Sequence, residues 1–172
     1  MKQLEELVVR GVREVLAEIR DADAGGLAGF ALVTDEGMMT LHAASQSRDF
    51  AKSERGEESF FMPVDWPEEH GFVHLDEANE RLVEIASEAS ARRAEGASHA
   101  DYDERVRAVV SCLVSALATV QADDESLARA LTMVICTDGG GIWYELETEA
   151  VKRLNSPELY QRYQQWAAQW SD

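Results

Sequence analysis

The sequence predicts a single α+β domain over residues 1–172, in which about five helices pack a small antiparallel or mixed sheet of three to five strands. Apolar residues recur at helical spacing near both ends and through the middle of the chain. Two strand-like runs, residues 30–34 and 133–137, each end in Thr followed by Asp-X-Gly. Helices and strands do not alternate regularly, so a doubly wound parallel sheet is not expected.

The N-terminal segment predicts a helix followed by a β-hairpin. Residues 4–21 place apolar side chains at i, i+3 and i+4, which indicates an amphipathic helix that ends before Gly25. Residues 30–34 and 38–43 are apolar runs separated by a short Asp-Glu-Gly sequence. Because Asp accepts hydrogen bonds from nearby backbone and Gly tolerates positive φ, this separator favours a tight turn between two strands.

The next segment combines irregular and strand-like sequence. Polar residues 46–58 fit a helical turn and a loop, and residues 60–62 predict a short strand that Pro63 stops. Pro63 and Pro67 flank Trp66, and each proline biases the residue before it away from the helical conformation. A fixed, irregular loop is therefore expected around Trp66.

Two helices and a buried strand are expected in the central part of the chain. Residues 76–89 have helical apolar spacing, and residues 101–120 add an almost wholly apolar middle, which places this second helix at the centre of the fold. Residues 92–99 lack apolar anchors and predict a flexible loop. Residues 131–136 are apolar at both parities, as in a strand covered on both faces.

The C-terminal segment predicts one helix and leaves a second element open. Residues 142–144 fit either a strand or the start of a helix that runs to Leu154. Ser156 is a favourable N-cap residue with Pro157 at the first helical position, and residues 159–170 form a helical apolar face.

Composition indicates a soluble, cytoplasmic protein. Cys112 and Cys136 lie in apolar segments and are too sparse for a disulfide framework, so both are expected to be buried thiols in a reducing compartment. Charged residues interrupt the N-terminal segment at once. No stretch approaches the roughly 18 apolar residues of a membrane span.

The charge balance bears on the kind of partner. The chain carries 16 Lys and Arg against 33 Asp and Glu, a net charge of −17, without a basic block. Such a surface repels phosphate backbones, which argues against binding of nucleic acid or of an anionic membrane. It suits a basic protein partner, although acidity by itself also confers solubility.

No motif indicates a metal site or a cofactor. His70 and His74 have the i, i+4 spacing of a zinc-binding helix, but the Glu that should follow the first His is missing and Gly71 disfavours the helix. The glycines at 139–141 lack the Lys and Ser/Thr of a phosphate-binding loop and fit a turn. The sequence also contains no Gly-X-Ser-X-Gly elbow.

Asp35 and Asp138, which follow the two strand ends, are the strongest candidates for chemistry. If the two strands are neighbours that run in the same direction, the two carboxylates would lie close together. Such a pair can bind a divalent ion or divide the roles of acid and base. Asp before Gly at a strand end is also ordinary turn chemistry, and this second interpretation is the more usual one.

Asp65 and Trp66 in the proline-flanked loop are the other candidate binding residues. Trp66 fits either an exposed aromatic that recognises a partner or a plug that holds the loop on the core. The burial typical of large aromatic residues favours the plug. Trp166 and Trp170 fit packing of the terminal helix or, alternatively, a face for oligomer formation.

Three segments resemble the bacterial family known as domain of unknown function 4303: residues 30–35 with the hairpin that follows, the corner Pro63-X-Asp65-Trp66, and residues 149–155. The resemblance covers most of the chain and implies a single-domain cytoplasmic α+β protein. It also implies an immunity-type role, because some members resemble proteins carried beside secreted toxins. It assigns no catalytic residue, and the acidic residues that follow Trp66 depart from the family pattern.

These observations favour a non-enzymatic, acidic protein-binding module without a cofactor, and more specifically an immunity-type inhibitor of a basic toxin. The alternative is a small metal-dependent hydrolase that uses Asp35 and Asp138, with Asp65 or His70 as a further ligand. The candidate binding residues are accordingly Asp35, Asp65, Trp66 and Asp138.

Overall fold

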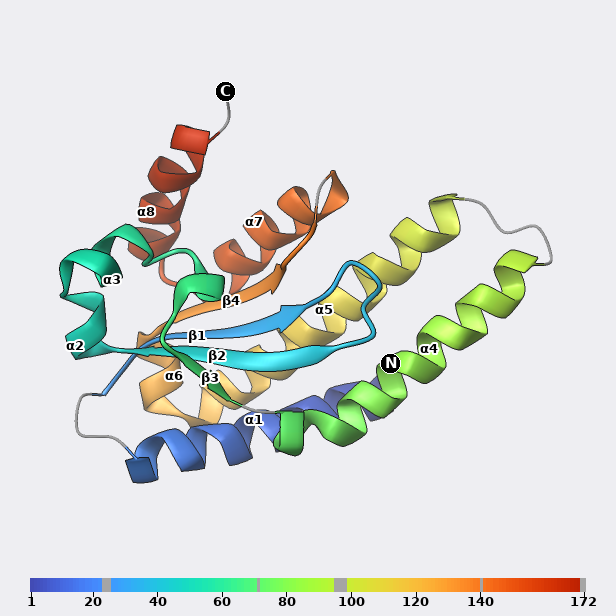
Figure 1. Cartoon of the computed structure of the whole chain (residues 1–172), viewed down its shortest axis with the longest axis horizontal. Helices are drawn as coiled ribbons and strands as arrows, with labels where there is room; N and C mark the ends of the chain where they lie inside the picture. The colour runs from blue at the N-terminus through green and yellow to red at the C-terminus, as the bar shows by residue number, and fades with distance from the viewer. Residues whose placement is uncertain (23–25, 71, 95–98, 140, 171–172) are drawn as a thin grey trace.

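The computed structural model describes residues 1–22, 26–70, 72–94, 99–139 and 141–170. These residues form a four-stranded mixed sheet with helices on both faces, which confirms the predicted α+β class (Figure 1). The strands are β1 Leu27–Thr34, β2 Leu41–Ser47, β3 Glu68–His70 and β4 Leu131–Cys136. The longer helices are α1 Lys2–Ala22, α4 Asp76–Ala94, α5 His99–Asp123, α7 Ile142–Leu154 and α8 Pro157–Ala167. The shorter helices are α2 Arg48–Ala51, α3 Glu54–Glu58 and α6 Glu125–Arg129, with the 3₁₀ segments η1 Pro63–Asp65, η2 Phe72–Leu75 and η3 Ala168–Trp170.

β1 lies in the interior of the sheet, whose strand order is β3-β2-β1-β4. It pairs antiparallel with β2, where Thr34 lies opposite Leu41, and parallel with β4, where Thr34 lies opposite Cys136. The short β3 pairs antiparallel with the outer edge of β2. Because β1 and β4 run in the same direction, the turns that follow them lie at the same end of the sheet.

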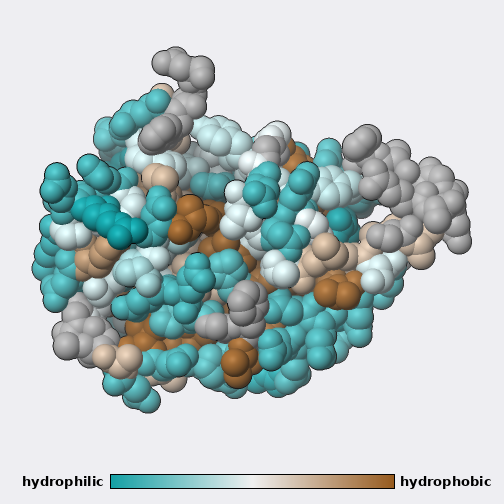
Figure 2. All heavy atoms as spheres, viewed as in Figure 1, coloured by the Kyte–Doolittle hydropathy of each residue, from teal (hydrophilic) through white to brown (hydrophobic). Residues whose placement is uncertain are grey.

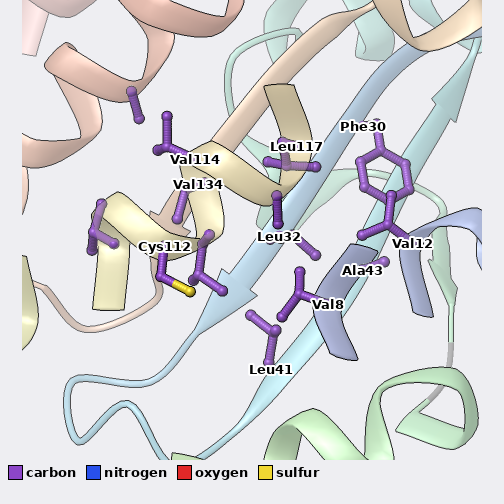
Figure 3. Close-up of a cluster of buried hydrophobic side chains, with 14 of the residues drawn as sticks. Val8, Val12, Phe30, Leu32, Leu41, Ala43, Cys112, Val114, Leu117 and Val134 are labelled. Atoms are coloured by element: carbon purple, nitrogen blue, oxygen red, sulfur yellow. The ribbon is translucent and has the colours of Figure 1, made fainter. Parts of the chain in front are cut away.

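The larger hydrophobic core lies between the sheet and helices α1, α4 and α5. Figure 3 shows Val8 and Val12 of α1 and Leu117 of α5 gathered around Phe30 and Leu32 of β1. All five side chains are almost fully buried. The apolar stripe predicted for the first helix is therefore the face that packs on the sheet.

α5 is the central helix that its apolar composition predicted. By length and composition alone, residues 101–123 are also able to span a membrane, with a mean hydropathy of 1.4 in the most apolar stretch. Half of that stretch is buried against the rest of the protein. Burial of this kind is typical of the core helix of a soluble protein.

A smaller core covers the opposite face of the sheet, under α8. Ala31 and Val33 of β1 contribute to it together with Phe61, Trp66 and Tyr163. The rings of Phe61 and Tyr163 meet edge to face, with centroids 5.8 Å apart. Alternate residues of β1 thus enter two different cores, which is why the strand is apolar at both parities.

The aromatic residues of the C-terminal segment belong in part to this smaller core. The ring centroid of Trp166 lies 5.7 Å from that of Phe61 and 5.8 Å from that of Tyr163. The side chain of Trp170 lies outside the described part of the chain. An oligomer face on this helix therefore stays a prediction.

β2 begins at Leu41, three residues after the predicted start of the strand at Met38. The residues between them belong to the hairpin turn, because the Asp35 carboxylate accepts hydrogen bonds from the backbone N–H groups of Met39 and Thr40. The hairpin itself is confirmed.

The predicted short strand at residues 60–62 is wrong. The segment is a turn in which the Met62 N–H donates to the Ser59 carbonyl, and the Asp65 N–H donates to the Met62 carbonyl. These local bonds satisfy the backbone without a strand partner. The third strand is instead Glu68–His70, a polar segment that pairs with Ala43–Ser45 and that local sequence does not reveal.

Residues 142–144, left open between strand and helix, begin α7. Gly141 has φ of +59°, a left-handed conformation that changes the direction of the chain before the helix. The buried residues Trp143, Leu146 and Ala150 then recur at helical spacing.

The two segments predicted as irregular contain more helix than expected. Residues 46–58 include the short helices α2 and α3, whose N-caps are Ser47 and Ser53. Within the loop predicted at 92–99, residues 92–94 belong to α4, which continues to Ala94, and His99 begins α5. The other half of that prediction, residues 95–98, lies outside the described residues.

Two asparagine side chains complete the hydrogen bonding of strand residues. Asn155, which follows α7, accepts from the Thr132 N–H at 2.8 Å and donates to the Thr132 carbonyl at 2.7 Å. Asn79 of α4 does the same at Leu41 of β2, at 2.6 and 3.1 Å. Each side-chain amide bonds to the strand as the peptide group of a neighbouring strand would. The backbone N–H and carbonyl groups of Thr132 and Leu41 therefore have hydrogen-bond partners.

Replacing Asn155 with Ala is expected to lower the free energy of unfolding by about 2 kcal/mol, because the N–H and carbonyl of the fully buried Thr132 would lose their partners. Urea denaturation followed by circular dichroism measures the change. Gln161→Ala, on the exposed face of α8, is the control and should stay within about 0.5 kcal/mol of the parent. Equal stabilities for Asn155→Ala and the parent would contradict this role of the amide.

Candidate functional site

Asp35 ends β1 and closes the hairpin through its own side chain. Its Oδ2 atom accepts hydrogen bonds from the backbone N–H groups of Thr40, at 2.7 Å, and Met39, at 3.2 Å, and from the Thr40 hydroxyl. Met38, in the turn between Asp35 and Met39, has a φ of +52°, and its backbone N–H donates to the Asp35 carbonyl. The turn interpretation of Asp35 is therefore confirmed.

These contacts also set the protonation of Asp35. Partial burial alone would raise its pKa, but the hydrogen bonds from Thr40, Met39 and Gly37 outweigh burial and hold the pKa below its ordinary value. Because the folded pKa is the lower one, the ionised carboxylate stabilises the fold above the unfolded pKa. That contribution is lost as the pH falls through the folded pKa.

Asp138 lies at the same end of the sheet as Asp35. The Thr137 N–H donates to the Thr34 carbonyl at 3.0 Å and so continues the pairing of β1 and β4 into the two turns. The Asp138 side chain is exposed and accepts from the Thr137 hydroxyl at 3.2 Å. The condition set by the sequence, two neighbouring strands that run in the same direction, is thus met.

Cys136 is placed between the two aspartates at the end of β4. Burial is the main cause that raises the pKa of its thiol, and the negative charges of Asp35 and Asp138 raise it further, against a hydrogen bond from the Asp138 backbone. A thiol with a raised pKa stays protonated at neutral pH. Cys136 is therefore not an activated nucleophile.

The two carboxylates differ in what they offer to a ligand. The Asp35 carboxylate is engaged by the turn, whereas that of Asp138 points to solvent with a single hydroxyl partner among the described residues. In the part of the chain that the structure describes, no three His, Cys, Asp or Glu residues come together as a metal ion requires. The end of the sheet that carries Asp35 and Asp138 therefore resembles a negatively charged surface more than a metal-coordination site.

The start of α5 docks on the hairpin turn and adds further acidic residues to this end. The Tyr102 hydroxyl donates to the Glu36 carbonyl at 2.9 Å, and the Arg105 guanidinium donates to the Gly37 carbonyl at 3.1 Å. The same turn of α5 carries two exposed acids. We refer to the following five residues together as the acidic end: Asp35, Glu36, Asp103, Glu104 and Asp138.

Two exposed apolar side chains accompany the acidic end. Met39 in the hairpin turn is 48% exposed, and Tyr144 in the first turn of α7 is 56% exposed. Sequence reasoning missed both, together with the docking of Tyr102 and Arg105. Tyr102 and Arg105 had no local signal, because they reach the hairpin turn only through contacts between segments distant in the sequence. Met39 lies only four residues after Asp35, but the sequence assigned it to the strand and not to the turn.

Asp65 and Trp66 lie away from the acidic end. Trp66 is 4% exposed, its indole N–H donates to the Ser59 carbonyl at 3.1 Å, and its ring packs against Gly29, where a Cβ atom would come within 2.7 Å. Trp66 is therefore the plug that the sequence favoured. Gly29 precedes Asp35 by six residues, or roughly 20 Å along a strand, so the structure does not bring the exposed Asp65 to the carboxylate pair.

His70 lies beside Ser45 and Glu68 at the edge of the sheet, an arrangement that sequence spacing did not reveal. The Ser45 hydroxyl is 2.7 Å from His70 Nε2 and 3.2 Å from Glu68 Oε2, and Glu68 approaches the same ring nitrogen at 3.8 Å. A catalytic triad places the acid on the other ring nitrogen, and Ser45 is only 1% exposed. Burial lowers the pKa of His70 and so favours its neutral form, and the three side chains form a polar network between β2 and β3.

Replacing Asp35 with Ala is expected to destabilise the protein by about 2 kcal/mol at pH 7, because three hydrogen bonds to a carboxylate are lost. The difference from the parent should shrink as the pH falls from neutral through the folded pKa of Asp35, which lies below its ordinary value, because the parent carboxylate then becomes protonated too. Urea denaturation across this pH range measures both effects. Asp138→Ala is the matched control and should stay near the parent, so an equal loss in both variants would refute the assignment.

No family model, curated protein or solved structure matches the chain. The resemblance to the domain of unknown function 4303 therefore stays a prediction. The geometry of the acidic end is the basis for a functional proposal.

Proposed function

We propose that this protein is a non-enzymatic, cytoplasmic binding protein whose acidic end accepts a basic protein partner, as an immunity-type inhibitor of a basic toxin would. One observation carries the proposal. Exposed acids and exposed apolar side chains occur together on a hydrogen-bonded scaffold at one end of the sheet.

The charges of the acidic end favour a basic partner. Glu36, Glu104 and Asp138 are exposed, and the neighbouring cation Arg105 is engaged by the Gly37 carbonyl. The net charge of −17 adds a field of the same sign. Complementary charge accelerates encounter and disfavours acidic partners, and salt weakens both effects because screening limits their reach to about 8 Å at physiological ionic strength.

Met39 and Tyr144 supply the apolar contact area that charge alone does not provide. Figure 2 shows that hydrophilic side chains cover most of the visible face and that hydrophobic ones form small, separate groups. Met and Tyr are enriched in protein interfaces relative to other surface. Because the Asp35 carboxylate holds the backbone beside Met39, less conformational freedom is lost when a partner binds.

The metal-dependent hydrolase is less well supported. A divalent cation such as Ca²⁺ or Mg²⁺ takes about six or more oxygen ligands, usually with two or more carboxylates. The Asp35 carboxylate already accepts hydrogen bonds from Met39 and Thr40, and Asp65 lies near the other end of β1. A metal ion would therefore have to share a carboxylate whose Oδ2 atom already holds the hairpin turn.

Reversing two charges at the acidic end, Glu36→Lys with Asp138→Lys, is expected to abolish capture of basic proteins from a cytoplasmic lysate. The control, Glu58→Lys with Glu80→Lys, makes the same change in net charge at exposed positions elsewhere and should retain capture. Immobilised parent and variants are compared at about 0.05 M and about 0.5 M NaCl, with mass spectrometry of the bound fraction.

The parent should lose its partner at the higher salt concentration, because exposed charges are screened there. A bound fraction that is the same for both double variants, or that resists salt, would contradict the proposal. So would a parent that captures no basic protein at low salt.

A further inference from the structure

A groove of about 490 Å³ lies between α2 and α8, near the start of β1 and the end of β2. Its walls carry three cations, Arg48, Lys52 and Arg162, against one acid, Glu57. We call it the cationic groove. In Figure 1 the helices α2, α3 and α8 lie together on the left, whereas the turn that follows β1 lies on the right. The groove therefore lies at the end of the sheet opposite to the acidic end, and its charge is mainly positive where that of the acidic end is negative.

Within the described residues, the cations of the groove lack the carboxylate partners that many, though not all, of the other cations have. Among the described residues, no ion pair involves Arg48, Lys52 or Arg162. Arginines outside the groove that do pair with carboxylates are Arg10, Arg13, Arg20, Arg81, Arg107 and Arg129. In a chain with about twice as many acids as cations, this groove is lined by three cations and one acid. An anionic ligand would relieve the repulsion among the three cations.

The groove is built from elements that fix its cations from two sides. On the α8 side, the Arg162 guanidinium lies 4.8 Å from the centroid of the Phe60 ring, a cation–π contact. On the α2 side, the backbone N–H of Arg48 donates to the Gly26 carbonyl at 2.8 Å and the Ser47 hydroxyl caps the helix, so the backbone that carries the Arg48 side chain is held in place. Apolar wall is supplied by the half-buried ring of Phe60 together with small alanine side chains.

We propose that the cationic groove binds a small organic phosphate, with the phosphoryl group held by Arg48, Lys52 and Arg162 and the organic portion resting on Phe60. Arginine forms paired hydrogen bonds with phosphate oxygens, and lysine adds a compact positive charge. A volume of about 490 Å³ is typical of small-molecule sites.

The ligand must be small because of the charge on the rest of the protein. A nucleic-acid chain would extend from the groove onto a surface that contributes to the net charge of −17. A small anion experiences mainly the charges within about 8 Å, and the groove lining carries three positive charges against one negative charge.

Isothermal titration calorimetry with adenosine monophosphate, inorganic phosphate and adenosine tests this site. The parent should bind adenosine monophosphate at least about tenfold more tightly than either inorganic phosphate or adenosine, since only the first compound offers both the phosphoryl group and an aromatic portion. Arg162→Gln and Lys52→Gln should each weaken that binding by about tenfold, the loss of one charge-assisted hydrogen bond. Arg129→Gln removes the same charge from an ion-paired position on α6 and should leave binding within about twofold.

Lys52 is exposed after the end of α2, so its variant keeps the test valid if Arg162→Gln disturbs the packing of α8. Circular dichroism and a thermal melt verify the fold of each variant. Absence of saturable binding of adenosine monophosphate to the parent would overturn the proposal. Equal loss of binding in the Arg129→Gln control would do the same.

Discussion

The position of β1 between an antiparallel and a parallel neighbour governs the arrangement of the rest of the molecule. Both faces of the strand are buried, so its alternate residues, such as Phe30 and Ala31, enter two separate cores. Because β4 runs in the same direction, the turns after β1 and β4 meet at one end. Because β2 runs back, its last residues meet the start of β1 at the other end, roughly 25 Å away for an eight-residue strand.

The two ends of β1 differ in charge. At each end, hydrogen bonds or ring contacts hold the structure in place, while charged side chains stay accessible to a ligand. At one end, the Asp35 carboxylate and the Tyr102 hydroxyl fix the backbone of the hairpin, while acids beside them face solvent. At the other, Phe60 supports Arg162, and three cations that form no ion pair among the described residues line a groove. Our two proposals, a basic partner at one end and a small anion at the other, both rest on Coulomb attraction acting over about a Debye length.

Features with a local cause were predictable from the sequence. The amphipathic N-terminal helix, the turn closed by Asp35 and the N-cap at Ser156 follow from periodicity and from side-chain hydrogen bonds within a few residues, and all three are present. Burial of Trp66 followed from its size. Features made by distant segments were not predictable: β3 is polar and exists only because β2 offers it an edge, and Arg48 meets Arg162 only after α8 has packed on the smaller core.

Two-dimensional amide NMR of the labelled protein, titrated in separate experiments with a lysine-rich peptide and with adenosine monophosphate, tests the separation of charge most directly. Amide shifts caused by the peptide should cluster in residues 35–40, 102–107 and 137–144, and those caused by the nucleotide in residues 26–28, 48–52 and 60–62. Overlapping sets of shifted amides, or shifts spread evenly over the surface, would contradict the account.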